Sequence, residues 1–220
     1  MVHALLLLIL ALSLQALDIV DRPIPFGSER IELTRSYIAE HYGIDAKSIA
    51  ITPRIIVVHA TGIDNLDDSM ARFVSERLPT DRPDITNGGA LNVSAHFMVD
   101  FDGTIYRLMD ETAMARHVIG LNYSSIGIEN VGGGSGDYSN LTEAQLEANR
   151  KLIAYLLDKY PTITHLIGHH EYLCMESTPL WLERDPNYRT RKTDPGAAFI
   201  HRLRDYFNEL ETPPCGTKHD

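Results

Sequence analysis

Apolar residues recur along the chain with two spacings, and the shorter one predicts β-strands. We expect strands at residues 54–60, 93–99, 104–108, 125–130 and 164–168. The first of these runs, R-I-I-V-V-H-A, is β-branched and continuous, which is typical of a strand covered on both faces. The second and third flank an Asp102-Gly103 turn, which predicts a β-hairpin.

The longer spacing predicts helices. We expect them at residues 29–41, 65–78, 142–160 and 197–210. Gly43 follows the first and favours a stop there. Thr142 and Gln145 form the pattern of a capping box at the start of the third. Residues 80–92 are rich in Pro, Gly and Asp and predict a surface loop, and residues 18–26 predict an extended leader.

Strands therefore alternate with helices, and one hairpin is inserted. This order predicts an α/β fold, a single domain with a central mixed β-sheet flanked by helices on both faces. We divide the chain into a signal peptide at 1–16, an N-terminal leader and helix at 17–50, a catalytic domain at 51–210 and a C-terminal tail at 211–220.

Composition narrows the class of partner. The chain has 220 residues with 44% apolar content, enough for one sizeable core, and its formal net charge is -10. Nucleic-acid binding depends on clustered Lys and Arg, so we expect no nucleic-acid partner. An anionic substrate would have to be held by a local pocket.

The first residues resemble a secretory signal. Residues 4–12 are an unbroken apolar run, and the small residues Ser13 and Ala16 follow it. A membrane span needs about 20 apolar residues, so we expect no stable span. The pattern predicts a secreted or periplasmic protein, and the alternatives are a short membrane anchor or a buried N-terminal helix.

Cysteine usage leaves two readings open. The chain has two cysteines, Cys174 and Cys215. In an oxidising compartment they can form a disulfide. They can equally be two unrelated thiols, because sequence does not test the geometry that a disulfide needs.

Chemistry-bearing residues stand at predicted strand ends, where α/β sheets place their sites. His59 and Glu129 close two strands, and His169 follows a third. A later loop holds Lys192 and Asp194, a cation and a carboxylate two residues apart. Two His and one Asp suit a catalytic zinc site, which has three protein ligands and one open position for water.

Five strings carry a resemblance to a known family. They are V-V-H-A-T (57–61), V-S-A-H-F-M-V-D-F-D-G-T-I-Y (93–106), S-I-G-I-E (125–129), G-H (168–169) and R-K-T-D-P-G (191–196). Together, and in this order, they resemble the zinc N-acetylmuramoyl-L-alanine amidases, a family that shares its fold with the peptidoglycan-recognition proteins. The resemblance runs from about Arg54 to Phe207.

The resemblance implies a role for each matched residue. His59, His169 and Asp194 would bind one Zn²⁺ per chain. Glu129 matches the acidic catalytic residue, which can take a proton from water and deliver it to the leaving amine. Lys192 matches the basic residue that can stabilise an oxyanion.

Other residues are less firmly placed. His117 lies in an A-R-H string where relatives often have a His, and we expect it to contact substrate. An insert at 171–190 separates the last two ligands, which are much closer together in many relatives. It contains Cys174, a rival third ligand because some relatives use Cys there. It also contains Trp181, expected to bind substrate as a lid or groove wall, with a packed surface loop as the alternative.

Two further histidines are expected to play no part in the chemistry. His96 lies on a hairpin strand and is expected to be a hydrogen-bonded core residue, and His170 is expected to be a bystander beside a ligand.

The resemblance implies a hydrolase acting on peptidoglycan or muropeptides, and we expect a monomer. It would cut the amide bond between the muramoyl lactyl group and L-alanine of the stem peptide. A non-catalytic peptidoglycan-recognition module is the alternative, since the fold supports both. A structural zinc protein with Cys174 as a fourth ligand is the third reading.

Overall fold

A six-stranded sheet, in the order β1-β4-β3-β5-β2-β6, forms the centre of the molecule. The computed structural model describes residues 17–215. The strands are β1 (Ile19–Asp21), β2 (Ile55–Ala60), β3 (Phe97–Val99), β4 (Ile105–Arg107), β5 (Ser125–Asn130) and β6 (His165–Gly168). The hairpin pair β3–β4 is antiparallel and the other pairs of this sheet are parallel. The mixed α/β sheet is therefore confirmed.

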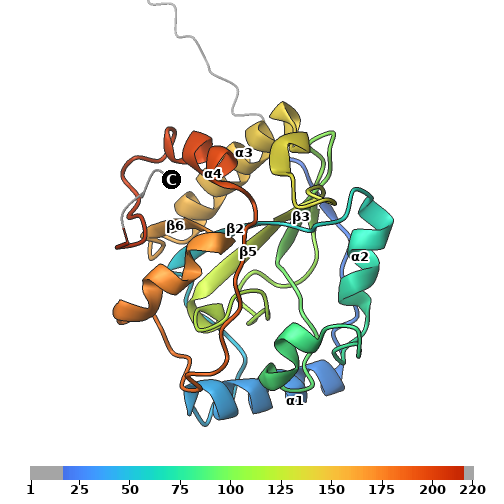
Figure 1. Cartoon of the computed structure of the whole chain (residues 1–220), viewed down its shortest axis with the longest axis vertical. Coiled ribbons are helices and arrows are strands. Elements are labelled where there is room, and N and C mark those ends of the chain that lie inside the picture. Colours follow the sequence, from blue (N-terminus) through green and yellow to red (C-terminus); the bar gives the residue numbers. More distant parts are fainter. Residues whose placement is uncertain (1–16, 216–220) are drawn as a thin grey trace, which may run out of the picture.

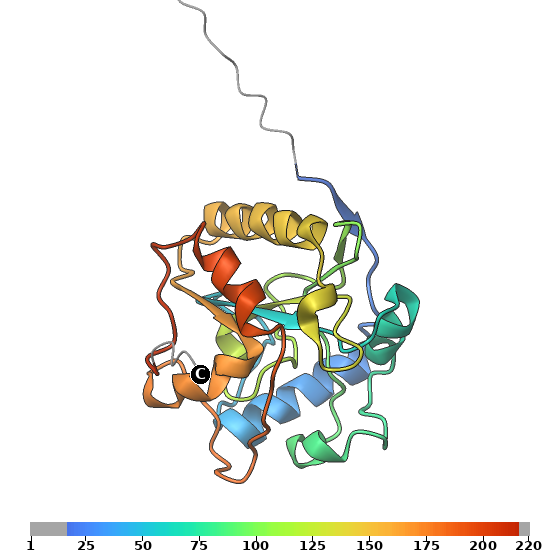
Figure 2. The same ribbon diagram turned by 45° about the horizontal axis from the view of Figure 1, so that its top comes forward.

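Helices cover both faces of this sheet, as predicted. They are α1 (Ser28–Tyr37), α2 (Leu66–Val74), α3 (Glu143–Lys159) and α4 (Ala197–Arg204). Figures 1 and 2 show α3 and α4 together on one side of the sheet, α1 on the other side and α2 beside the sheet. No helix among residues 17–215 is long and apolar enough to cross a membrane.

Strand β2 explains why the sheet needs both layers. Successive side chains of a strand point to opposite faces. Ile56 and Val58 pack into the core beneath α3 and α4, whereas Ile55 and Val57 pack into the core beside α1. All four side chains are fully buried. His59 is two residues after Val57, so its side chain points to the same face of the sheet, the α1 side.

Two local signals act as the sequence predicted. The Thr142 hydroxyl accepts from the Gln145 backbone N–H at 3.1 Å, and the Gln145 amide oxygen accepts from the Thr142 N–H at 2.9 Å. This capping box fixes the start of α3. Gly43 ends the helical segment after α1 with a φ of 64°, which is unfavourable for residues with a side chain.

The two ends of the described chain belong to the sheet more closely than expected. The predicted leader contains β1, which pairs with β4. At the opposite edge, Glu211 donates its N–H to Thr164 O at 2.8 Å and accepts from Leu166 N–H at 3.2 Å. Both segments satisfy backbone groups that a sheet edge leaves open. The predicted signal peptide at 1–16 lies outside the described residues.

Candidate active site

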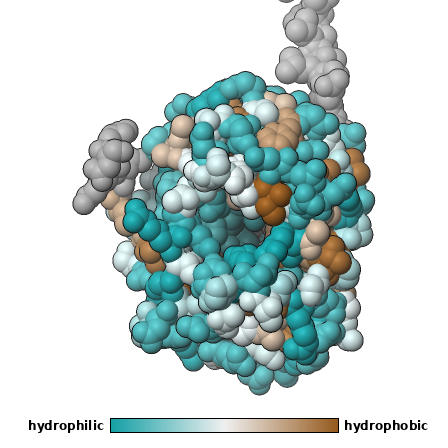
Figure 3. Space-filling model, turned by 45° about the vertical axis from the view of Figure 1, so that its right-hand side comes forward, coloured by the Kyte–Doolittle hydropathy of each residue, from teal (hydrophilic) through white to brown (hydrophobic). Residues whose placement is uncertain are grey.

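The candidate catalytic residues share one face of the sheet because of strand register. His59 on β2 lies directly beside Glu129 on β5, and both point toward the α1 side. His169 follows β6, whose Gly168 is paired with Val58. These ends surround a cavity of about 280 Å³. A hollow bordered mostly by hydrophilic residues is visible in Figure 3.

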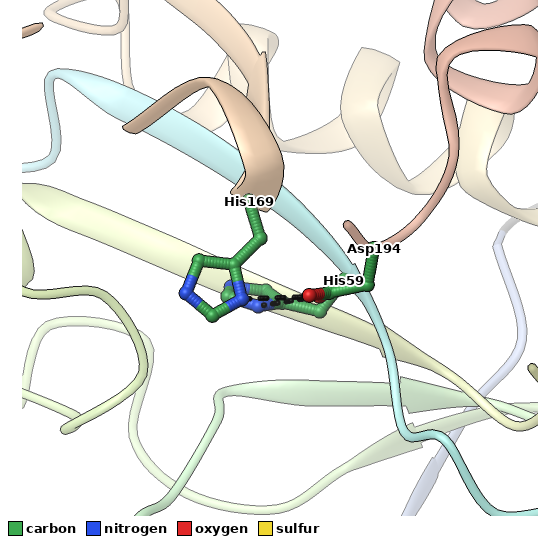
Figure 4. A group of neighbouring side chains, drawn as sticks. All are labelled: His59, His169 and Asp194. Carbon is green, nitrogen blue, oxygen red and sulfur yellow. Dashed lines mark hydrogen bonds and ion pairs between the residues drawn. The ribbon is translucent and has the colours of Figure 1, made fainter. Parts of the chain in front are cut away.

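Three side chains meet in this cavity as a group suited to a metal ion. One ligand atom from each of His59, His169 and Asp194 lies within 4.8 Å of the others. The Asp194 Oδ2 atom is 3.0 Å from His169 Nδ1 and 3.5 Å from His59 Nδ1. Figure 4 shows the carboxylate pointing between the two rings. Two imidazole nitrogens and one carboxylate fit a catalytic zinc ion, which leaves its fourth position open.

Electrostatics favour the protonation states that a metal ligand requires. Burial, followed by repulsion from His169, lowers the pKa of His59 to about 4. Burial alone would raise the pKa of Asp194, but the neighbouring His169 and His59 outweigh it and hold that pKa well below its usual range. His59 is therefore neutral and Asp194 is ionised near pH 7, as metal binding demands.

Asp194 is held in place by a residue that was expected to be a bystander. The backbone N–H of His170 donates to the carbonyl oxygen of Asp194 at 2.9 Å, and His170 Nδ1 lies 3.0 Å from the same oxygen. His170 is not part of the candidate metal group, as expected, but it fixes the loop that carries the third candidate ligand.

Glu129 is a carboxyl group kept away from water. Burial, followed by repulsion from Asp194, raises its pKa to about 8. Its buried Oε2 atom has no hydrogen-bond partner among residues 17–215. A strongly perturbed carboxyl group in a cavity, with an oxygen left unpaired, is typical of a functional site.

Cations line the same cavity, although the protein as a whole is acidic. Lys192 is one, and its Nζ atom lies 3.8 Å from Asp84 Oδ2. Arg82 is another, and it lowers the pKa of Glu129 against the effect of burial. The surface-loop prediction for residues 80–92 was therefore incomplete. Ile85 within this segment is buried and also lines the cavity.

Tyr138 lines the cavity too and was not anticipated. Its hydroxyl group lies 2.8 Å from the Thr193 hydroxyl oxygen. It follows the Gly-rich segment after β5, so the rule that sites gather at strand ends could have included it.

His117 and Trp181 occupy different surroundings. His117 lines the cavity, and its Nδ1 atom lies 3.0 Å from His59 Nε2. Trp181 is not among the cavity-lining residues. It stacks on Tyr172 with ring centroids 6.1 Å apart, beneath the Arg189 guanidinium. Substrate contact by either residue stays untested, and the stacking of Trp181 away from the cavity lining favours the packed-loop alternative for that residue.

Cys174 is bonded to Cys215 in a disulfide. Cys174 therefore has no free thiol, and the group that could hold a metal ion contains Asp194 rather than Cys174. His96 is fully buried and bonded through both ring nitrogens to backbone groups, so the core role predicted for it is confirmed.

Comparison with known proteins points to one family. The family model for N-acetylmuramoyl-L-alanine amidase matches residues 49–197. The endolysin of Escherichia phage T7 is 41% identical over 87 residues, and that of Klebsiella phage KP32 is 37% identical over 86 residues. Each match covers 38% of this chain and 56% of the relative, so the chain spans about half the length of these curated relatives.

The fold has solved counterparts. The structure of N-acetylmuramoyl-L-alanine amidase LysC from Clostridium intestinale URNW superimposes with a TM-score of 0.54 at 22% identity. The superposition covers 88% of this chain and 99% of that chain. The region matched by the family model includes β2, β5, β6 and the loop bearing Asp194, which together build the cavity. The chain therefore belongs to the N-acetylmuramoyl-L-alanine amidase family.

Proposed function

We propose that the protein is a zinc-dependent peptidoglycan amidase. It hydrolyses the amide bond between the N-acetylmuramoyl lactyl group and L-alanine of the stem peptide. The observation that carries the proposal is the convergence of a His-His-Asp group and the unpaired carboxyl of Glu129 in one cavity. His59, His169 and Asp194 would hold the metal. When bound, zinc acts as a Lewis acid and lowers the pKa of water.

The remaining groups provide the proton transfers and charge stabilisation of amide hydrolysis. Glu129 accepts a proton from the attacking water and then delivers it to the leaving nitrogen of L-alanine. Burial raises the pKa of Glu129 to about 8, and the positive charge of a metal ion held nearby would lower it again, toward the range where a carboxyl group both accepts and releases a proton near neutral pH. Lys192 lies on the cavity wall, where its ammonium group stabilises negative charge developing on the carbonyl oxygen.

We further propose that the protein acts outside the cytoplasm, as a secreted or periplasmic enzyme. The bond between Cys174 and Cys215 supports this location, because disulfides persist mainly in oxidising compartments. The apolar run at residues 4–12 is the second support.

Purified muropeptides provide the test. The wild-type protein should release muramyl sugars and peptides with a new L-alanine amino terminus, both identified by mass spectrometry. Glu129→Gln should bind zinc but release neither product. New reducing sugar ends without free L-alanine amines would indicate a glycosidase. Tight muropeptide binding without any cleavage by the zinc-loaded protein would favour a recognition module.

A further inference from the structure

A buried line of hydrogen bonds begins at His59 and ends at a backbone carbonyl. His59 Nε2 lies 3.0 Å from His117 Nδ1, and His117 Nε2 lies 3.1 Å from Ser125 Oγ. The Ser125 hydroxyl lies 2.9 Å from the carbonyl oxygen of Leu121. The side chains of this line are shielded from water, since all three residues are at most 9% exposed.

The Leu121 carbonyl oxygen, at the end of this line, determines which atom donates in each of its hydrogen bonds. A carbonyl oxygen can only accept, so the single hydroxyl proton of Ser125 goes to Leu121. The Ser125 oxygen then accepts from His117 Nε2–H. His117 Nδ1 therefore carries a lone pair and accepts from His59 Nε2–H. In a neutral imidazole only one nitrogen is protonated, so His59 Nδ1 carries a lone pair as well.

We propose that Ser125 and His117 are positioning residues that lock His59 in the tautomer whose Nδ1 lone pair faces Asp194 and His169. This inference rests on the proposed function, because it supplies one ligand of the zinc site. A metal binds only an unprotonated ring nitrogen, and the partner of the other nitrogen decides which tautomer is present. The ligand is thus prepared before any ion arrives.

The opposite proton order is less favourable in this geometry. It would place a proton on His59 Nδ1, directed at Asp194 Oδ2 over 3.5 Å. That oxygen already has His169 Nδ1 at the shorter distance of 3.0 Å. Reversal would also turn the Ser125 proton toward His117 and leave two oxygen lone pairs facing each other at 2.9 Å.

The His117 ring is held in place by its neighbours on the chain. Its backbone N–H donates to Asn122 Oδ1 at 2.8 Å. A Cβ atom at Gly127 would lie 2.7 Å from His117 Nδ1, so only glycine leaves room for the ring against β5. His96 does not compete for His117, because Ala113 O and Gly127 N–H occupy its two ring nitrogens.

The tautomer can be measured directly by ¹⁵N NMR on the full chain labelled at histidine, after chelator treatment and a circular dichroism check of folding. We expect a pyrrole-type shift for His59 Nε2 and a pyridine-type shift for His59 Nδ1. A proton on His59 Nδ1, or an even mixture of tautomers, would overturn the inference.

Zinc affinity provides the second readout, by competition with a chromophoric chelator. Ser125→Ala should weaken zinc binding by about tenfold or more, the usual cost of losing a group that orients a ligand. Ser124→Ala is the matched control. Within residues 17–215 the Ser124 hydroxyl also donates to Leu121 O, at 3.3 Å, but makes no hydrogen bond to His117. Equal zinc affinity of the two variants would refute the role of Ser125.

Neither readout depends on hydrolysis. A protein that shows the expected tautomer and the selective loss of zinc affinity in Ser125→Ala supports this inference even if it cleaves no muropeptide. In that case the proposed function alone would fail.

Discussion

Replacing Glu129 by glutamine should stabilise the folded protein, and the gain should grow with pH. The pKa of Glu129 is raised from 4.5 to about 8 by burial and by the nearby Asp194. Below pH 4.5 the carboxyl is neutral in both the folded and the unfolded chain. Between 4.5 and 8 the unfolded chain releases this proton while the folded protein keeps it, so stability falls by about 1.4 kcal/mol per pH unit. Above pH 8 the loss levels off.

The size of the effect follows from these two pKa values. From pH 5 to pH 8 the wild-type protein should lose roughly 3–4 kcal/mol of unfolding free energy at this one site. Glu129→Gln has nearly the same shape and no proton to lose, so it should escape this loss. The carboxyl proposed to be catalytic would therefore be retained at the expense of stability, a common trade-off at active sites.

The assay is urea unfolding of chelator-treated protein, followed by circular dichroism at several pH values between 5 and 8. Glu143→Gln is the control, because Glu143 is exposed and paired with Arg202, which lowers its pKa. The unfolding free energy of this control should change with pH in the same way as that of wild type between pH 5 and 8. A stability difference between Glu129→Gln and wild type that stays constant, or shrinks as pH rises, would refute the reasoning.

Three further predictions concern the metal loop and the insert. Asp194→Ala should lose its zinc and nearly all turnover, whereas Cys174→Ser should keep its zinc, with zinc content measured by elemental analysis. The reverse pattern would identify Cys174 as the ligand. Cys174→Ser and Cys215→Ser should each lower the free energy of unfolding by a similar amount, about 2–5 kcal/mol, because either change removes the same disulfide. Clearly unequal losses would argue against a purely structural bridge. Trp181→Ala should destabilise the protein by about 2 kcal/mol or more through lost packing, with KM unchanged. A raised KM at unchanged stability would instead support the groove wall.

The sequence was most informative where structure depends on neighbours along the chain. The β-branched run of β2, the capping box at Thr142 and the glycine stop at Gly43 are local signals, and each is confirmed. The pairing of β1 with β4 was missed because two strands distant in sequence make it. A short extended segment does not reveal its partner.

The same distinction applies to the site. Strand-end positions indicated His59, Glu129 and His169, because register and parity carry such residues to one face. The contacts of His170 with Asp194 and of His117 with His59 depend on tertiary structure. The spacing of these residues in the sequence does not predict them. The disulfide is similar, since only geometry decides whether two cysteines meet.

The disulfide also has a consequence for a chain that has been cut. Cys174 and Cys215 are 41 residues apart, and the segment between them contains Lys192 and Asp194. Residues in this segment such as Arg184 and Arg191 are exposed, where trypsin-like proteases find their substrates. One cleavage there would leave both fragments joined by the sulfur bridge, so the candidate metal ligand would stay tethered to the sheet. In denaturing electrophoresis, nicked protein should therefore migrate as one species until a reductant separates the two fragments.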